Sequence, residues 1–164
     1  MSFAPSLIER AGALIEAYRA ADLMIVTAES CTGGLLAALL TEVPGSSDVL
    51  ERGFVPYSNE AKTETIGVPA VLIEKLGAVS EEVARAMALG ALNRSQAQIA
   101  VSITGIAGPG GGSPSKPVGL VHLATARREA GVKHRRCQFQ GNRETVRLAT
   151  LETALEMLRE RLDG

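Results

Sequence analysis

The hydrophobic and polar positions along the chain follow two periods, one typical of helices and one typical of buried strands. Near the start, apolar residues recur at helical spacing, and Ser6 followed by Glu9 matches a capping box, so a helix is expected from there to about Asp22. Further helices are expected over residues 31–40, 59–66, 69–76 and 80–93. A last helix from about Asn142 carries one apolar stripe, formed by Leu148, Leu151, Leu155, Leu158 and Leu162.

Short apolar, β-branched runs between these helices predict strands. The predicted strands cover residues 23–27, 53–57, 98–103, 118–126 and 133–139. The last two form a hairpin around Glu129–Gly131. Pro56 lacks a backbone N–H, so the second strand should lie at a sheet edge or end there. Alternating strands and helices predict one three-layer α/β/α domain over residues 1–164, with a mixed, partly parallel sheet.

Composition and charge narrow the class of protein. A chain of 164 residues with a net charge of -1 is long enough for a core and lacks the charge of a general nucleic-acid binder. The basic residues gather at the hairpin tip, where solvation explains them: Arg127, Arg128, Lys133, His134, Arg135 and Arg136. No apolar run is long enough for a membrane span, and no signal peptide is recognisable. A cytoplasmic protein without nucleic-acid or membrane partners is expected.

Ser30 lies where a buried strand turns into a helix. A serine there can cap the free amides of the first helical turn, or it can face outward as a nucleophile while those amides stabilise an oxyanion. Gly33 and Gly34 have no side chains, so a ligand could approach the backbone closely. Spacing alone favours the cap.

A nucleophilic serine needs a base. The chain has two histidines, His122 and His134, and neither has an acidic partner nearby in sequence, which disfavours a Ser-His-Asp triad. Lys62 is the other candidate, provided that burial or a neighbouring cation lowers its pKa enough for it to be neutral. The alternative for Lys62 is an ordinary solvated lysine on a helix face.

The glycine-rich loop over residues 105–119 lacks both the Walker and the Rossmann pattern, yet a loop of this length in a compact domain is commonly functional. Thr104 at the end of the preceding strand should face the crevice in which open α/β sheets bind ligands. Arg143 stands in the first turn of the last helix, where a cation is unfavourable unless it holds an anion such as phosphate or pairs with Glu144. No His, Cys or carboxylate set has metal-ligand spacing, so no metal or cofactor is expected.

Several motifs occur together in one order, and they carry a family resemblance. They are TAESCTGG (27–34), GSS (45–47), GFVPYSNEAK (53–62), GAVS (77–80), SITGIAGPGGG (102–112) and KPVGLV (116–121). The chain resembles the CinA carboxy-terminal domain family of nicotinamide-nucleotide amidohydrolases, also named competence/damage-inducible proteins. It is similar to the stand-alone form, without the additional amino-terminal domain of the larger members.

The resemblance implies deamidation of nicotinamide mononucleotide to nicotinate mononucleotide and ammonia, without a metal, in pyridine-nucleotide recycling, by a dimer or larger homo-oligomer. It makes Ser30 the nucleophile, Lys62 the base and Tyr57 a hydrogen-bonding partner of that pair. The remaining family positions are expected to bind substrate: Thr32, Gly33, Gly34, Ser47, Thr104, Gly105, Gly108 and Arg143. Ser47 is also a second candidate nucleophile, although it can equally cap the turn at Asp48. Pro56 departs from the commoner residue at its position.

Two alternatives remain open on the sequence. The same dyad could hydrolyse another small amide. The chain could instead be a non-enzymatic nucleotide-binding or regulatory module, linked to competence or DNA damage, in which Ser30 only caps a helix.

Overall fold

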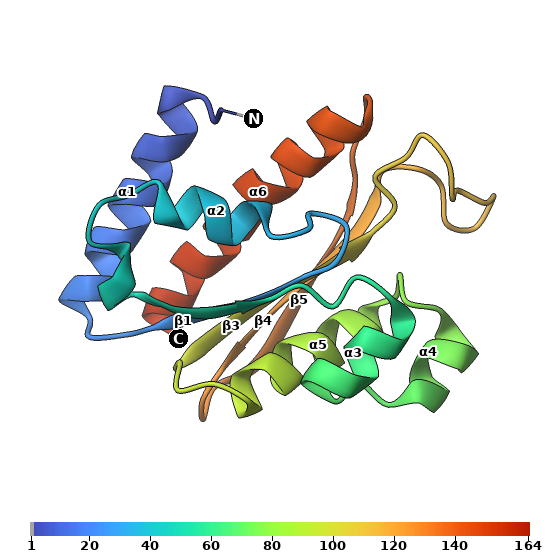
Figure 1. Ribbon diagram of the computed structural model, residues 1–164, viewed down its shortest axis with the longest axis horizontal. Helices are drawn as coiled ribbons and strands as arrows, with labels where there is room; N and C mark the ends of the chain where they lie inside the picture. The colour runs from blue at the N-terminus through green and yellow to red at the C-terminus, as the bar shows by residue number, and fades with distance from the viewer. Residues whose placement is uncertain (1) are drawn as a thin grey trace.

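The computed structural model describes residues 2–164 and has three layers, with a five-stranded sheet between two sets of helices (Figure 1). Its elements in chain order are α1 (Pro5–Ala20), β1 (Ile25–Glu29), α2 (Leu35–Thr41), the 3₁₀ turn η1 (Ser46–Asp48), β2 (Leu50–Phe54), α3 (Asn59–Ile66), α4 (Ala70–Leu76), α5 (Glu81–Asn93), β3 (Ile99–Gly105), β4 (Leu120–Arg127), β5 (Gly131–Gln138), α6 (Arg143–Glu160) and the 3₁₀ turn η2 (Arg161–Asp163).

The sheet is mixed and partly parallel, as the sequence predicts. The strand order is β2-β1-β3-β4-β5. Strand β1 is parallel to β2 and β3, and the hairpin β4–β5 adds two antiparallel strands. Strand β2 lies at an edge and ends before Pro56, which confirms the expectation drawn from that proline.

Each face of the sheet has its own hydrophobic core, because successive side chains of a strand point to opposite faces. Helices α1, α2 and α6 cover one face, where Ile25 and Ile99 are buried. Helices α3, α4 and α5 cover the other, where Val26 and Ala100 are buried (Figure 1). The leucine stripe of α6 faces the first core, with Leu148 at its partly buried margin. Leu162, which was predicted on the same helix, lies in η2 and also packs at that margin.

Two predicted helix starts are wrong. Helix α1 begins at Pro5, with no side-chain cap, so Ser6 lies inside the helix and the capping box does not form. Proline is favoured at a first helical position because its missing N–H would be unpaired there. Helix α2 begins at Leu35 rather than Cys31, because Gly33 and Gly34 adopt left-handed backbone angles, with φ of +57° and +98°.

Distant segments of the chain meet at the carboxyl ends of the parallel strands β1 and β3. Glu29, the last residue of β1, is in register with Ile103 of β3. Ser30 and the loop after β3 therefore start side by side. The start of α6 reaches the same region, because Arg143 donates to the Gly108 carbonyl. Ser47 lies in η1, before the amino end of β2. Because β1 and β2 are parallel, Ser47 is at the opposite end of these strands from Ser30.

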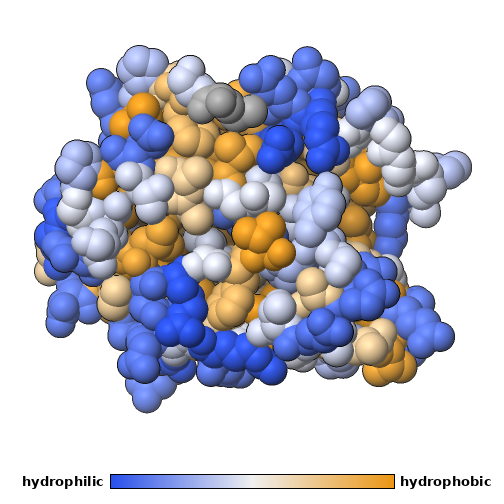
Figure 2. Space-filling model, in the orientation of Figure 1, coloured by the Kyte–Doolittle hydropathy of each residue, from blue (hydrophilic) through white to orange (hydrophobic). Residues whose placement is uncertain are grey.

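The surface mixes hydrophobic and hydrophilic residues on the face shown in Figure 2. At the hairpin, the basic cluster is partly engaged with backbone carbonyls: Arg128 donates to the carbonyls of Leu92, Ser95 and Ala97. None of the helices in residues 2–164 combines the length and the hydropathy needed to cross a bilayer.

Candidate active site

Ser30 stands on the turn between β1 and α2. Its amide donates to the Ile103 carbonyl, and its own carbonyl accepts from the Gly33 amide, both at 3.0 Å. No side chain caps α2 at Gly34, the residue before the helix. The Ser30 hydroxyl is not a helix cap; its partner is the amine of Lys62, with Nζ 3.1 Å from Oγ.

Lys62 is turned inward from α3. Ser58 caps this helix by accepting from the Ala61 amide, and Lys62 shares the inner face of the helix with Ile66, four residues later. Only 1% of Lys62 is exposed. Besides Ser30, its Nζ contacts two backbone carbonyls, those of Pro56 at 3.1 Å and Tyr57 at 3.3 Å.

Burial lowers the pKa of Lys62 below the ordinary lysine value, against smaller opposing effects of Cys31 and Glu60. No carboxylate among residues 2–164 forms an ion pair with it. The alternative of a solvated helix-face lysine is therefore wrong, because Lys62 is a buried amine with a lowered pKa.

A hollow of about 270 Å³ opens beside Ser30. It is lined by the turn over residues 30–34 (the nucleophile turn, after the role predicted for Ser30), the segment between β2 and α3, the glycine-rich loop and the start of α6. The lining residues are Ser30, Cys31, Tyr57, Gly105, Ile106, Ala107, Gly108, Gly110, Gly111 and Arg143. Burial raises the pKa of the Cys31 thiol to about 12. Cys31 is therefore a neutral thiol near pH 7, which disfavours it as a nucleophile.

Tyr57 and Arg143 meet at the rim of this hollow. The Tyr57 side chain is 60% exposed, and its phenol oxygen accepts from Arg143 Nη2 at 3.3 Å. Only the backbone carbonyl of Tyr57 contacts Lys62, so the phenol is not the partner of the dyad that the resemblance implies. Arg143 also donates to the Gly108 carbonyl at 2.8 Å, and none of the ion pairs within residues 2–164 includes it. The pairing with Glu144 is thus wrong.

Three predicted substrate contacts lie elsewhere. Thr104 is buried, and its hydroxyl donates to the Ala78 carbonyl at 2.8 Å, because this side chain points to the face covered by the α4–α5 connection. Ser47 is exposed at the amino ends of the parallel strands, away from Ser30, so its position also argues against it as the nucleophile of this site. Thr32 is buried, and its hydroxyl is committed to Glu29 at 2.6 Å.

The paired glycines shape the nucleophile turn and do not line the hollow. A Cβ at Gly34 would lie 3.5 Å from Val55, and one at Gly33 would lie 3.6 Å from Arg147. By contrast, Gly105 and Gly108 do line it. A Cβ at Gly108, where φ is +84°, would lie 2.5 Å from Val118, so the loop needs a glycine there.

The sequence reasoning missed Glu29 and Arg147. The buried Glu29 carboxylate accepts from the Leu36 and Ala37 amides, both at 2.9 Å, in addition to Thr32. The available signal was an acidic residue that ends a buried strand just before a helix amino terminus, where carboxylates are favourable. Arg147 donates to the Thr32 carbonyl at 3.0 Å, and the sequence carried no signal for this contact, because the acceptor is a backbone group of a distant segment.

The two histidines contact each other, away from the serine. His122 Nδ1 lies 2.8 Å from His134 Nε2, and His134 Nδ1 lies 3.5 Å from the Glu81 carboxylate. Neither histidine hydrogen-bonds to Ser30, which has Lys62 as its partner. The geometry thus provides no Ser-His-Asp triad.

Stability should fall on acidification because of His122. Burial, with help from His134 and Arg136, lowers its pKa to about 4, whereas the ordinary value is 6.5. As the pH falls, the unfolded state therefore binds the proton first. The contribution is intact above about pH 6.5 and is lost progressively toward pH 4. The free energy of unfolding, measured by urea titration, should fall between pH 7 and pH 5 in both proteins. The fall should be smaller in His122→Gln than in the wild type by roughly 1 kcal/mol, after allowance for solvent screening. Equal losses would contradict this assignment.

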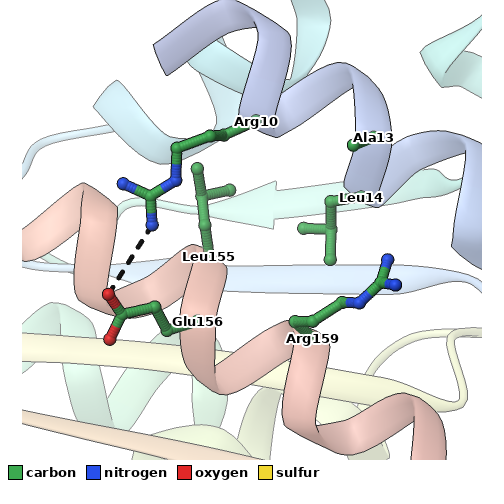
Figure 3. A pocket seen from close by; sticks show the side chains of 6 residues that line it. All are labelled: Arg10, Ala13, Leu14, Leu155, Glu156 and Arg159. Carbon is green, nitrogen blue, oxygen red and sulfur yellow. Dashed lines mark ion pairs between the residues drawn. The ribbon is translucent and has the colours of Figure 1, made fainter. Parts of the chain in front are cut away.

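Another hollow, of about 390 Å³, lies between α1 and α6 over Leu14 and Leu155 (Figure 3). Arg10 and Glu156 face each other across it as an ion pair. None of the predicted site residues lines it. Within residues 2–164, no group of three or more His, Cys, Asp or Glu side chains is arranged to hold a metal ion.

Comparisons with known proteins agree with this architecture. The profile of the CinA C-terminal domain matches residues 8–162. A CinA-like protein of Mycolicibacterium gilvum is 52% identical over 96% of this chain, and one of Geobacter sulfurreducens is 49% identical over 92%. The aligned regions make up 38% and 36% of those two relatives, so the chain spans about a third of their length.

Solved structures extend the likeness to the whole chain. The competence/damage inducible protein CihA of Agrobacterium tumefaciens is 51% identical, with a TM-score of 0.95 and full coverage of both chains. The competence damage-inducible protein A of Klebsiella pneumoniae is 35% identical, with a TM-score of 0.92, over 96% of this chain and 98% of its own. With its sequence profile and its fold both matched, this chain belongs to the CinA C-terminal domain family.

Proposed function

We propose that this chain hydrolyses the carboxamide of nicotinamide mononucleotide, releasing nicotinate mononucleotide and ammonia. The observation that carries the proposal is the buried contact between Lys62 Nζ and Ser30 Oγ at 3.1 Å. A neutral amine has two N–H groups and one lone pair. The carbonyls of Pro56 and Tyr57 can accept the two N–H groups, which leaves the lone pair for the Ser30 hydroxyl.

The proposed reaction is an acyl transfer to Ser30, followed by hydrolysis of the acyl-enzyme. Lys62 takes the Ser30 proton while Oγ attacks the carboxamide carbon, which forms a tetrahedral oxyanion. The protonated Lys62 returns the proton to the leaving nitrogen, the C–N bond breaks, and ammonia departs from an acyl-serine. A water molecule, deprotonated by Lys62, attacks the ester, and Lys62 returns that proton to Ser30 Oγ as the C–Oγ bond breaks. The product is the carboxylic acid, which loses its remaining proton to solvent or to the released ammonia and departs as the carboxylate. Cys31 lines the hollow, and we assign its backbone amide as the donor to the oxyanion.

Arg143 supports a nucleotide rather than a simple amide as substrate. It lines both the hollow beside Ser30 and a second one of about 450 Å³, which also share Ala107. A pyridine ring beside Ser30 would extend its ribose phosphate past the Arg143 guanidinium into the second hollow. Guanidinium groups suit phosphate because they offer several donors in a fixed planar arrangement.

Arg143→Met is expected to raise the KM for nicotinamide mononucleotide by about tenfold or more, because a hydrogen bond to a charged group contributes roughly 1.5–3 kcal/mol. The matched control is nicotinamide riboside, which lacks the phosphate and should be hydrolysed with little change. Steady-state kinetics on both substrates measure the effect. An equal rise for both would mean that Arg143 acts on the loop at Gly108 rather than on phosphate.

Incubation of the purified protein with nicotinamide mononucleotide tests the function itself. Ammonia and nicotinate mononucleotide should appear in equal amounts, measured by a coupled assay and by chromatography. Nicotinamide, a dinucleotide and short aliphatic amides should be slower substrates; a preference for one of them would identify an amidase of another small amide. Nucleotide binding without ammonia from any amide would support the non-enzymatic module instead.

A further inference from the structure

Arg147 is a second arginine of α6 that reaches the nucleophile turn, one helical turn after Arg143. Its Nη2 donates to the Thr32 carbonyl, which also accepts from the Leu35 amide at 3.0 Å. Its Nε is buried and has no hydrogen-bond partner among residues 2–164. An unpaired buried donor lowers stability, so the contribution of this guanidinium lies in its contact with the turn.

By holding the Thr32 carbonyl, Arg147 restrains the orientation of two peptide planes in the turn. In a trans peptide, the carbonyl and the following N–H point in opposite directions. Arg147 fixes the Thr32 carbonyl, and the Gly33 amide in the same plane donates to the Ser30 carbonyl at 3.0 Å. The Ser30 carbonyl in turn shares its plane with the Cys31 amide, which must point away from the interior of the turn. Cys31 and Ser30 both line the hollow.

We infer that Arg147 is a positioning residue that aims the Cys31 amide at the carboxamide oxygen of the substrate, through the Thr32–Gly33 and Ser30–Cys31 peptides. The inference rests on the proposed amidase function for the role of the Cys31 amide, but the holding of the turn by Arg147 does not depend on it. Arg147 touches neither the reacting atoms nor Lys62.

The flexibility of the turn makes such a restraint necessary. Gly33 and Gly34 occupy left-handed backbone conformations that they can leave without a steric penalty. Glu29 holds the Thr32 hydroxyl from the sheet side, and Arg147 holds the Thr32 carbonyl from the α6 side. Arg147 also lies close to Cys31: its positive charge lowers the pKa of the Cys31 thiol, against the larger raising effect of burial. Its charge is thus near the place where the oxyanion would form.

Amide hydrogen exchange tests the positioning without any need for catalysis. In Arg147→Met, the Gly33 amide should exchange at least about tenfold faster than in the wild type, because the Thr32–Gly33 peptide that carries this N–H is no longer held by Arg147. Arg147→Lys should restore part of the protection. The control is Arg159→Met, an exposed arginine in the last turn of the same helix, which should change nothing at Gly33. Unchanged protection of Gly33 in Arg147→Met overturns the inference, whether or not the protein is an amidase.

Kinetics test the catalytic consequence. Arg147→Met should lower kcat for nicotinamide mononucleotide by roughly 10–100-fold with a KM within about threefold, because a misplaced oxyanion donor weakens the transition state and not the ground state. Arg147→Lys should recover most of kcat. If Arg147→Met does not fold, as judged by thermal melting, Arg147→Gln takes its place. An altered KM with unchanged kcat overturns the inference, whereas absence of activity in the wild type overturns the proposed function alone.

Discussion

Lys62→Met and Ser30→Ala are each expected to lower kcat for carboxamide hydrolysis by about 10³-fold or more, and the double variant should be no slower than either single one. Lys62 Nζ lies 3.1 Å from Ser30 Oγ, and in the proposed mechanism the two side chains act as a unit, so the loss of one leaves the other without a role. Independent contributions would instead multiply. Ammonia release, followed over hours at high enzyme concentration, measures the residual rates.

Two further variants separate the role of Lys62 as base from its charge and its packing. Lys62→Arg keeps a cation but cannot accept a proton near neutral pH, so it should be as inactive as Lys62→Met. Lys75→Met, on the exposed last turn of α4, is the matched control and should retain wild-type kcat. An active Lys62→Arg would show that the site needs a positive charge at this position and not a base.

The pH profile of the wild type gives an independent check on the same pair. Burial lowers the pKa of Lys62, so kcat/KM should rise with pH through a midpoint below the ordinary lysine value. The sign follows from the mechanism, because only the deprotonated amine accepts the serine proton. A rate that falls as Lys62 deprotonates would contradict its role as the base.

Local pattern was sufficient for most of the secondary structure. Helix α3 was predicted over its full extent, Asn59–Ile66. Pro56 predicted a strand that lies at an edge or ends there, and β2 is an edge strand that ends before Pro56, although it spans Leu50–Phe54 rather than the predicted 53–57. Element ends failed where backbone conformation outweighs residue preference. The left-handed Gly33 and Gly34 delay α2, and Pro5 replaces Ser6 at the start of α1.

The candidate site was harder to predict from the spacing of residues than the secondary structure, because its contacts join segments far apart in the chain. Ser30 and Lys62 are 32 residues apart, so the residues alone made Lys62 one candidate base beside an ordinary solvated lysine, and the family resemblance favoured the pairing. The inward turn of Lys62 had a local signal, its position four residues before the buried Ile66. Thr104 was misplaced because a strand end can point to either face, and the periodicity does not state which face is open.

Arg147 could not have been found from the sequence. Its partner, the Thr32 carbonyl, is a backbone group 115 residues away, and any residue type at position 32 would provide it. Glu29 was within reach of the rules for helix amino termini, but the apparent helix start at Cys31 hid the relation. Once α2 is known to begin at Leu35, Glu29 stands where its carboxylate can meet the free amides of Leu36 and Ala37.

Glu29→Ala is expected to lower the free energy of unfolding by about 3–5 kcal/mol. The carboxylate is fully buried, and its removal leaves the Thr32 hydroxyl and the Leu36 and Ala37 amides without acceptors. Helix α2 would be weakened, and with it the packing of Leu36, Leu39 and Leu40 in the first core. Urea denaturation at pH 7 measures the change through the transition midpoint.

Glu29→Gln separates acceptor geometry from the mere presence of a polar group. One amide oxygen can replace Oε2, which accepts from Thr32 and Leu36, but the amide nitrogen then faces the Ala37 N–H, donor against donor. The expected loss is therefore intermediate, about 1–3 kcal/mol. Thr41→Ala, at the exposed end of the same helix, is the control and should cost under about 0.5 kcal/mol. If Glu29→Ala were no more destabilising than Thr41→Ala, the carboxylate would not be what holds the helix beside Ser30, and the nucleophile turn would depend on Arg147 and its own backbone bonds instead.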